Sequence, residues 1–125
     1  MKPRVLVVDD SALARRAARK ILEEDGYDVE EASDGVQALE RYFLKPHDLV
    51  LLDMVMTGMY GLEVLEKMRQ IHPQVRALVL TADIQKSTAE QARATGAAGI
   101  LNKPVNREAL SAAAKIILAG GVTWN

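Results

Sequence analysis

Short aliphatic runs alternate along this chain with longer segments of helical period, and no other sequence feature constrains the fold as much. Five runs are typical of strands, at residues 4–8, 28–32, 48–52, 75–80 and 98–101. Strands that alternate with helices indicate βαβ units and a parallel sheet covered on both faces. Runs 4–8, 48–52 and 75–80 are rich in Val and Leu, as buried central strands are, whereas DVEEA at 28–32 is polar enough for an edge. The pattern predicts an α/β fold.

The segments between these runs have the caps and breaks of helices. The predicted N-caps are Ser11, Asp34 and Asn106, and the breaks are Gly26, Pro46 and Pro73. Segment 84–95 has a weak stripe of small residues, so we expect that helix to be thinly anchored. The expected buried helix positions are Leu13, Ala17, Ile21, Leu22, Val36, Leu39, Phe43, Leu62, Leu65, Met68, Ile71, Leu110, Ile116 and Ile117.

Length and composition narrow the class of protein. A chain of 125 residues fits one domain, which we expect to span 1–125, with a core over about 4–118 and a short tail over 119–125. The net charge of -1 provides no general field for nucleic acid or an anionic membrane. Without cysteine, neither disulfides nor a thiolate metal site can form. No run is long enough for a signal peptide or a membrane span, so a cytoplasmic location is expected.

Residues with reactive or charged side chains follow four of the aliphatic runs. Asp9 and Asp10 follow Val8, Asp53 follows Leu52, Thr81 follows Leu80, and Lys103 follows Asn102. In an open parallel sheet, the carboxyl ends of the strands share one edge, where ligands bind. We therefore expect these five side chains to meet.

Three neighbouring carboxylates would repel one another by about 3 to 4 kcal/mol per pair at an effective dielectric near 20, more than one lysine offsets. Mg²⁺ prefers one or two carboxylates, waters and a phosphate, so the cluster indicates Mg²⁺ and a phosphoryl group. Taken singly, each element has a simpler interpretation. Asp9 and Asp10 could cap the first helix, Asp53 could open a turn, Thr81 could cap a helix, and Lys103 could be a surface charge. Their joint placement favours the site.

With these residues placed, the chain resembles the receiver domains of two-component response regulators from about residue 4 to residue 118. The matching stretches are VLVVDDS at 5–11, LVLLDMVMTGMYG at 49–61, LVLTA at 78–82 and NKP at 102–104. Four such stretches, in order and at these spacings, are a specific signal. The resemblance implies a flavodoxin-like (βα)5 sandwich, with a five-stranded parallel sheet of order 2-1-3-4-5 and helices on both faces.

The resemblance also implies a role for each site residue. Asp53 would be the phosphoacceptor and also a Mg²⁺ ligand. The ion would further be held by Asp10 directly, by Asp9 through water, and by the backbone carbonyl of Val55. Thr81 and the backbone N–H of Ala82 would donate to phosphoryl oxygens, and the ammonium of Lys103 would pair with them. By the same likeness, the bond between Lys103 and Pro104 is expected to be cis.

Several positions depart from the family pattern. Ile100 stands where receivers commonly carry a Tyr or Phe that switches position, and an isoleucine has neither a ring to swing nor a hydroxyl. Thr57 replaces the usual proline and Tyr60 the usual Asp or Asn; we expect neither to touch the core chemistry. Val55 and Asp83 occupy positions that modulate loss of the phosphoryl group. A valine cannot orient a water, which predicts slow self-dephosphorylation and a partner phosphatase.

The remaining polar and aromatic residues receive plainer interpretations. We interpret the basic run RRAARK as a solvated helix face and His47 and His72 as surface residues. Met54, Met56 and Met59 are expected to pack in a loop, although an exposed methionine could serve a partner surface. Trp124 either folds back onto the domain or docks elsewhere.

Three kinds of function remain for this sequence. The first is a phosphorylation switch that is fed by a histidine kinase and acts on a target protein, as in chemotaxis-type single-domain regulators, with a monomer or weak dimer expected. The second is a receiver-like binding module that works without phosphorylation, which Ile100 keeps open. The third is an enzyme with external substrates, such as an aspartyl-phosphate phosphatase. The chain has no second acid two residues after Asp53, so external turnover is not expected.

Overall fold

The structure is a computed structural model that describes residues 2–82 and 84–124. In those residues, strands and helices alternate from the first strand to the last helix. The strands are β1 (Arg4–Val8), β2 (Asp28–Ala32), β3 (Leu49–Asp53), β4 (Ala77–Thr81) and β5 (Gly99–Asn102). The helices are α1 (Ala12–Glu24), α2 (Gly35–Leu44), α3 (Gly61–Ile71), α4 (Lys86–Thr95) and α5 (Arg107–Leu118).

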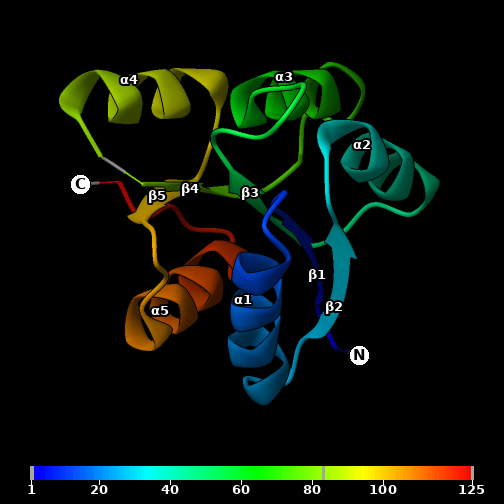
Figure 1. Ribbon diagram of the computed structural model, residues 1–125, viewed down its shortest axis with the longest axis vertical. Coiled ribbons are helices and arrows are strands. Elements are labelled where there is room, and N and C mark those ends of the chain that lie inside the picture. The colour runs from blue at the N-terminus through cyan, green and yellow to red at the C-terminus, as the bar shows by residue number, and fades with distance from the viewer. Residues whose placement is uncertain (1, 83, 125) are drawn as a thin grey trace.

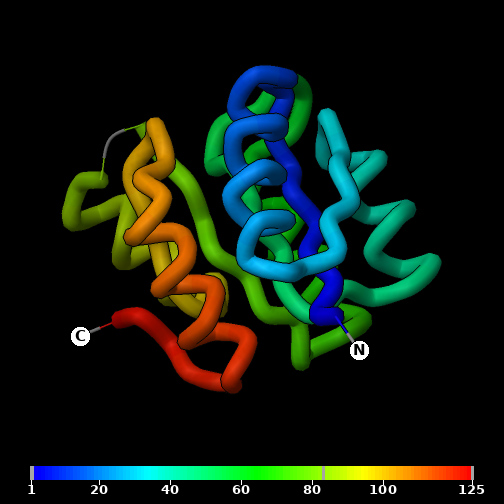
Figure 2. The backbone as a smooth tube through the Cα atoms, turned by 90° about the horizontal axis from the view of Figure 1, so that it is seen from below, coloured from blue at the N-terminus to red at the C-terminus, as the bar shows by residue number. Residues whose placement is uncertain are grey.

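The strands form one parallel sheet of order β2-β1-β3-β4-β5 (Figure 1). Helices α1 and α5 cover one face, and α2, α3 and α4 cover the other (Figures 1 and 2). The predicted flavodoxin-like architecture and strand order are therefore confirmed, with the polar strand β2 at an edge. In the described part of the chain, no helix combines the length and apolar character needed to cross a membrane.

Two apolar clusters, one on each face, hold the helices to the sheet. Alternate residues of β1 divide between them, because successive strand side chains point to opposite faces: Leu6 and Val8 join the cluster on the α2–α4 side, and Val5 and Val7 join the cluster on the α1–α5 side. Strands β3 and β4 are buried over their whole length. The sheet core is thus aliphatic, and it fixes the carboxyl ends of the strands.

The helix caps match the prediction, but several residues that were predicted to be buried on helix faces are exposed. The side chains of Ser11, Asp34 and Asn106 accept hydrogen bonds at the starts of α1, α2 and α5, as predicted. The predicted burial of Leu13 and Val36 is wrong, since these side chains are 80% and 58% exposed. Ile71 and Ile116 are also exposed, Ala17 lies on an exposed position, and Phe43 is at most partly covered. The buried residues are instead Ala18 and Leu22 in α1 and Gly35, Ala38 and Tyr42 in α2, so small residues form part of each buried face.

The prediction that His47 lies on the surface is wrong. Its side chain is buried between strand β2 and the turn before β3, where Nε2 lies 2.7 Å from Oε1 of Glu30. The ring stacks on Tyr42, whose hydroxyl is hydrogen-bonded to Nδ1 of His72. Burial lowers the pKa of His47 more than Glu30 raises it. The Tyr42 ring packs between both histidines, so they belong to one aromatic contact network rather than to a solvated surface.

The end of the chain folds back on the sheet, which decides between the two expectations for Trp124. The N–H of Thr123 donates to the carbonyl of Ala98 at 2.8 Å, and Nε1 of Trp124 donates to the carbonyl of Ala97 at 2.8 Å. The indole packs against the apolar cluster under α4, with the guanidinium carbon of Arg93 6.0 Å from its ring centroid. The tail is therefore held against the segment just before β5.

Candidate functional site

Three carboxylates converge at the carboxyl edge of the sheet. Asp9 and Asp10 follow β1, and Asp53 is the last residue of β3, the neighbouring strand. One carboxylate oxygen of each residue lies within 4.8 Å of the others. Asp9 and Asp53 are buried, with exposed fractions of 2% and 5%, whereas Asp10 is exposed. The parallel topology thus places in contact residues that are more than forty positions apart in the sequence.

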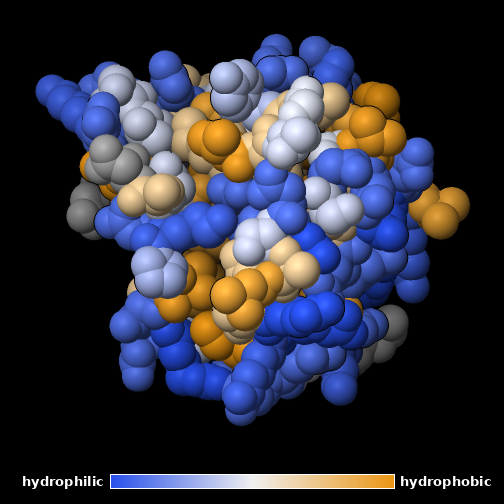
Figure 3. All heavy atoms as spheres, viewed as in Figure 1, coloured by the Kyte–Doolittle hydropathy of each residue, from blue (hydrophilic) through white to orange (hydrophobic). Residues whose placement is uncertain are grey.

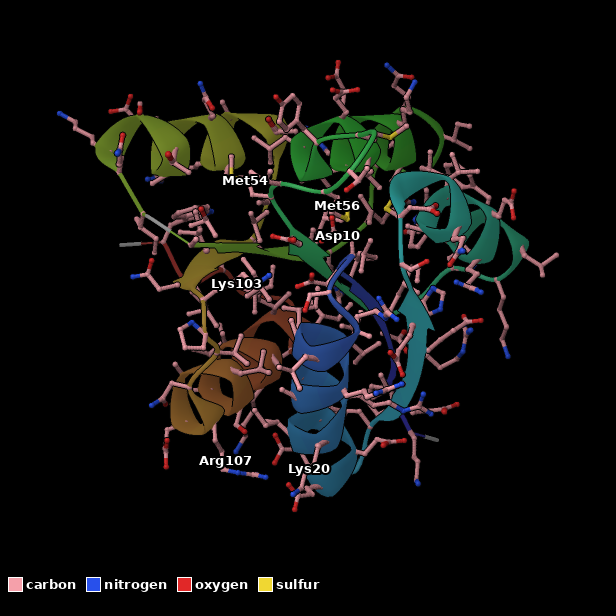
Figure 4. All side chains as sticks on the ribbon, in the orientation of Figure 1. Asp10, Lys20, Met54, Met56, Lys103 and Arg107 are labelled. Atoms are coloured by element: carbon pink, nitrogen blue, oxygen red, sulfur yellow. The ribbon has the colours of Figure 1, made fainter. Side chains whose placement is uncertain are left out.

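Lys103 provides the cationic group of this cluster. It follows β5, where its backbone N–H donates to the carbonyl of Thr81 at 2.7 Å and its bond to Pro104 is cis, as the resemblance implied. Its Nζ lies 2.7 Å from Oδ2 of Asp9 and 3.5 Å from Oδ2 of Asp53. Figure 4 shows Lys103 and Asp10 near the centre of the view, with Lys20 of α1 and Arg107 of α5 in its lower part. The ammonium therefore bridges two of the three carboxylates.

A pocket of about 460 Å³ opens over the cluster. It is lined by Asp10, Asp53, Met54, Val55, Thr81, Ala82 and Lys103. Thr81 is buried at the end of β4, and Ala82 is exposed beside it. All seven residues expected at the site, counting Asp9 beneath it, therefore lie at one edge of the sheet. Asp83, which we expected to affect loss of the phosphoryl group, lies outside the described residues.

Without a metal ion, the surroundings of Asp53 disfavour its ionised form even though Lys103 is present. Burial, together with the charge of Asp9, raises the pKa of Asp53 to about 6, although Lys103 and the N–H of Val55 act in the opposite direction. Partial burial lowers the pKa of Lys103, but its hydrogen bond to Asp9 and the charge of Asp53 outweigh burial, so the pKa is raised overall. Asp53 thus sits in surroundings that disfavour its charge.

The donor set fits a hard divalent cation. The side chains that converge are carboxylates, and Val55, in the loop after β3, lines the same pocket. Mg²⁺ is bound by one or two carboxylates with several waters, and the open pocket leaves room for them. Such an ion would favour the ionised form of Asp53 and oppose the effect of burial on its pKa.

Two residues of the site region were not predicted. Thr57 donates two hydrogen bonds to Oδ2 of Asp10, from its backbone N–H at 3.0 Å and from its hydroxyl at 3.1 Å. Thr57, which we expected not to touch the core chemistry, thus contacts Asp10, an expected Mg²⁺ ligand, directly. Arg15 donates to the backbone carbonyl of Asp9 at 2.8 Å and pairs with Glu31 at 3.0 Å, so the basic run is not purely a solvated face.

Two apolar depressions flank the acidic pocket. One, of about 490 Å³, lies between α1 and the segment after β5 and is lined by Leu13, Ala14, Ala17, Pro104 and Val105, among others. The other, of about 430 Å³, lies between α3 and α4 and includes Met54 and Leu62. Figure 3 shows apolar surface gathered between α1 and α5 and again near the α3–α4 junction. The polar site is therefore bordered by surfaces on which a protein could pack.

The raised pKa of Asp53 predicts a pH-dependent stability in the metal-free protein. Between pH 3.8 and about 6, the native state binds more protons than the unfolded state, so stability falls as pH rises. Asp53→Asn removes this penalty. In EDTA at pH 7, we expect the variant to be more stable than wild type by about 1 to 2 kcal/mol, a value discounted for solvent screening. By pH 4 the difference should vanish; urea unfolding at both pH values measures it, and an equal difference at both would contradict the assignment.

Comparison with known proteins agrees with this geometry. Residues 5–115 match the response regulator receiver domain family. The sporulation initiation phosphotransferase F of Bacillus subtilis is 31% identical over 115 residues, covering 92% of this chain and 93% of that protein. The chemotaxis protein CheY of Bacillus subtilis is 37% identical over 105 residues, covering 83% and 88%. Chemotaxis protein CheY4 of Vibrio cholerae has a similar structure, with a TM-score of 0.88 and 32% identity, covering 92% of this chain and 98% of that one.

The chain therefore belongs to the response regulator receiver domain family of two-component systems. It spans nearly the whole length of the two Bacillus relatives but only 51% of some longer response regulators that it matches.

Proposed function

We propose that this protein is a phosphorylation-dependent signalling switch in which Asp53 accepts a phosphoryl group from a histidine kinase. The observation that carries the proposal is the cluster itself: three carboxylates within 4.8 Å of one another, with the Nζ of Lys103 bridging Asp9 and Asp53. A structural ion pair needs one acid for its lysine and does not need three acids beside an open pocket. A phosphoacceptor site does, because two of the acids can hold a cation while the third reacts.

In the proposed reaction, a carboxylate oxygen of Asp53 attacks the phosphorus of the donor. An O–P bond forms as the P–N bond of the donor's phosphohistidine breaks, and the electron pair stays with the imidazole nitrogen, which takes a proton. Asp9, Asp10 and the carbonyl of Val55 would hold Mg²⁺, which neutralises charge on the phosphoryl oxygens when bound. Lys103 would pair with those oxygens, and Thr81 and the N–H of Ala82 would donate to them.

The response of the switch would pass through the loop after Thr81 to α4. In α4, Ala92 is the buried residue, and the rest of the helix is exposed or only partly covered. Such a helix is weakly anchored, so a new contact at Thr81 can bias its position. Ile100 packs on the same apolar cluster as Ala92 but has no ring to swing. We infer that a target protein reads the position of α4 rather than an aromatic rotamer.

Partner proteins would dock beside the site. Leu13 is 80% exposed on the apolar depression that adjoins Lys103, a position from which a kinase could present its phosphohistidine to Asp53.

Slow self-dephosphorylation, which follows from the aliphatic side chain of Val55, would make a partner phosphatase the main route of signal loss.

Intact mass measurement after treatment with acetyl phosphate and Mg²⁺ tests the proposal. Wild type should gain one phosphoryl group, and Asp53→Asn should gain none, because the amide is not a nucleophile under these conditions. Asp28→Asn, an exposed position on β2, is the matched control and should be labelled like wild type. Equal labelling of Asp53→Asn and wild type would refute the assignment. A wild type that accepts no phosphoryl group from any donor would favour the binding module that works without phosphorylation.

A further inference from the structure

We propose that Thr57 is a positioning residue for the cation site: it orients the carboxylate of Asp10 so that one oxygen stays open toward the ion. The inference rests on the proposed function, since it assigns a role at the same site. The observation behind this inference differs from the one behind the proposed function, however. Thr57 contributes no atom to the cluster of carboxylates and lies in the loop between β3 and α3.

The two hydrogen bonds from Thr57 converge on a single oxygen. The backbone N–H lies 3.0 Å and Oγ1 3.1 Å from Oδ2 of Asp10. A carboxylate oxygen has two lone pairs, so two donors occupy Oδ2 and leave Oδ1 as the oxygen free to coordinate. Asp10 is exposed and follows the end of β1, so without these bonds its side chain would sample several rotamers. Thr57 therefore selects the coordinating oxygen and restricts the rotamer.

The loop that carries Thr57 is itself well fixed. Met56 is buried in the apolar cluster on the α2–α4 side, immediately before Thr57. Gly58 follows in a left-handed conformation with φ of 89°, and Val55 forms an antiparallel bridge with Tyr60. The turn is thus anchored on both sides of Thr57, so its two donors have a defined position from which to hold Asp10.

This arrangement ties two ligand-bearing segments together. Val55, whose carbonyl is the proposed backbone ligand, is two residues before Thr57, and Asp10 lies on the turn after β1. By linking that turn to the loop after β3, Thr57 sets the spacing between the two ligands before the ion arrives. A proline at this position could provide neither of the donors, because it lacks both the N–H and the hydroxyl. Orientation of a metal ligand by an outer hydrogen bond is a general device for raising affinity.

Titration with Mg²⁺ alone, with the binding measured by isothermal calorimetry, tests the role of Thr57 without requiring phosphorylation. Thr57→Val removes the hydroxyl and keeps the size, and it should raise the Kd for Mg²⁺. Thr57→Pro removes both donors and should raise the Kd further, by about tenfold relative to wild type. Thr57→Ser keeps both donors and should restore the wild-type Kd. Thr95→Val is the matched control, since that hydroxyl bonds within α4 to the carbonyl of Gln91.

The outcomes separate the inference from the proposed function. If wild type binds Mg²⁺ and Thr57→Val binds it equally well or more tightly, Thr57 does not position Asp10, and the inference is wrong while the site stands. If wild type binds no Mg²⁺, the cation site itself fails. Thermal unfolding of each metal-free variant checks that the loop still folds, and a Thr57→Ser protein that is stable but has the weakened affinity of Thr57→Val would also overturn the role of the hydroxyl.

Discussion

Lys103→Met is expected to slow the labelling of Asp53 by acetyl phosphate by about 10²- to 10³-fold, the loss seen when one preorganised electrostatic donor is removed from a reaction that develops negative charge. The Nζ of Lys103 lies 2.7 Å from Asp9 and 3.5 Å from Asp53, so its removal leaves three carboxylates without their ammonium. The time course of phosphorylation, followed by intact mass at fixed Mg²⁺, measures the effect.

Two further variants separate charge from position at Lys103. Lys103→Arg keeps the positive charge but replaces a compact ammonium with a planar fork, so its labelling rate should lie between those of wild type and Lys103→Met. Lys115→Met removes an exposed charge from α5, far from the cluster, and should label normally. Labelling of Lys103→Met at the wild-type rate would show that the ammonium does not assist the transfer.

Gly61→Ala is expected to destabilise the fold by about 3 kcal/mol and to impair labelling of Asp53 as well. A Cβ added at Gly61 would lie 2.2 Å from the carbonyl oxygen of Asp53 and 3.1 Å from the Cα of Met54. The obstacle is backbone, which cannot rotate away, and the N–H of Gly61 is held by the carbonyl of Met54 at 2.9 Å. Relief of the clash must therefore shift the end of β3. Urea unfolding measures the stability, and intact mass measures the labelling.

The control for this substitution is Gly26→Ala. Gly26 has a φ of 95° but nothing within 4 Å of an added Cβ, so alanine there brings backbone strain without a clash, at about 1 kcal/mol. Its phosphorylation should be unchanged, because Gly26 lies at the far end of α1. If Gly61→Ala were no less stable than Gly26→Ala and labelled normally, the start of α3 would not be needed to hold Asp53 in place.

Strand positions could be predicted from the sequence because a buried parallel strand needs a short aliphatic run, and such runs are easily recognised. The bounds of β1 and β2 match the prediction, and those of the other strands differ by one or two residues. The convergence of Asp9, Asp53 and Lys103 followed from topology alone, since parallel strands place their carboxyl ends at one edge. The residues that follow the predicted strands were therefore enough to predict most of the site.

Helix faces were harder to predict because large apolar residues do not always mark the buried side. Ala18 is buried in α1 and Ala38 is buried in α2, whereas the larger Leu13 and Val36 of the same helices are exposed. A small residue lets a helix backbone come close to the sheet, a choice set by the packing distance rather than by hydrophobicity. The periodicity of apolar residues does not show whether a helix buries its small residues or its large ones.

The contact between Thr57 and Asp10 was missed for a different reason. It joins two turns, and the path of the second turn depends on the positive φ of Gly58 and on the burial of Met56. Thr57 replaces the proline that is usual at this position, and a proline has no hydrogen-bond donor to offer there. The replacement matters through what it adds, namely one backbone donor and one hydroxyl donor at the edge of the site.

The position of Trp124 gives this protein a built-in optical probe. The chain has a single tryptophan, so its indole emission comes from one known place. The indole donates to Ala97 just before β5 and lies under α4, with the guanidinium of Arg93 6.0 Å from its ring centroid. Indole emission shifts with the electric field at the ring and with contact to water. A displacement of α4 would carry Arg93 with it, so the fluorescence of the unlabelled protein would follow the helix in real time.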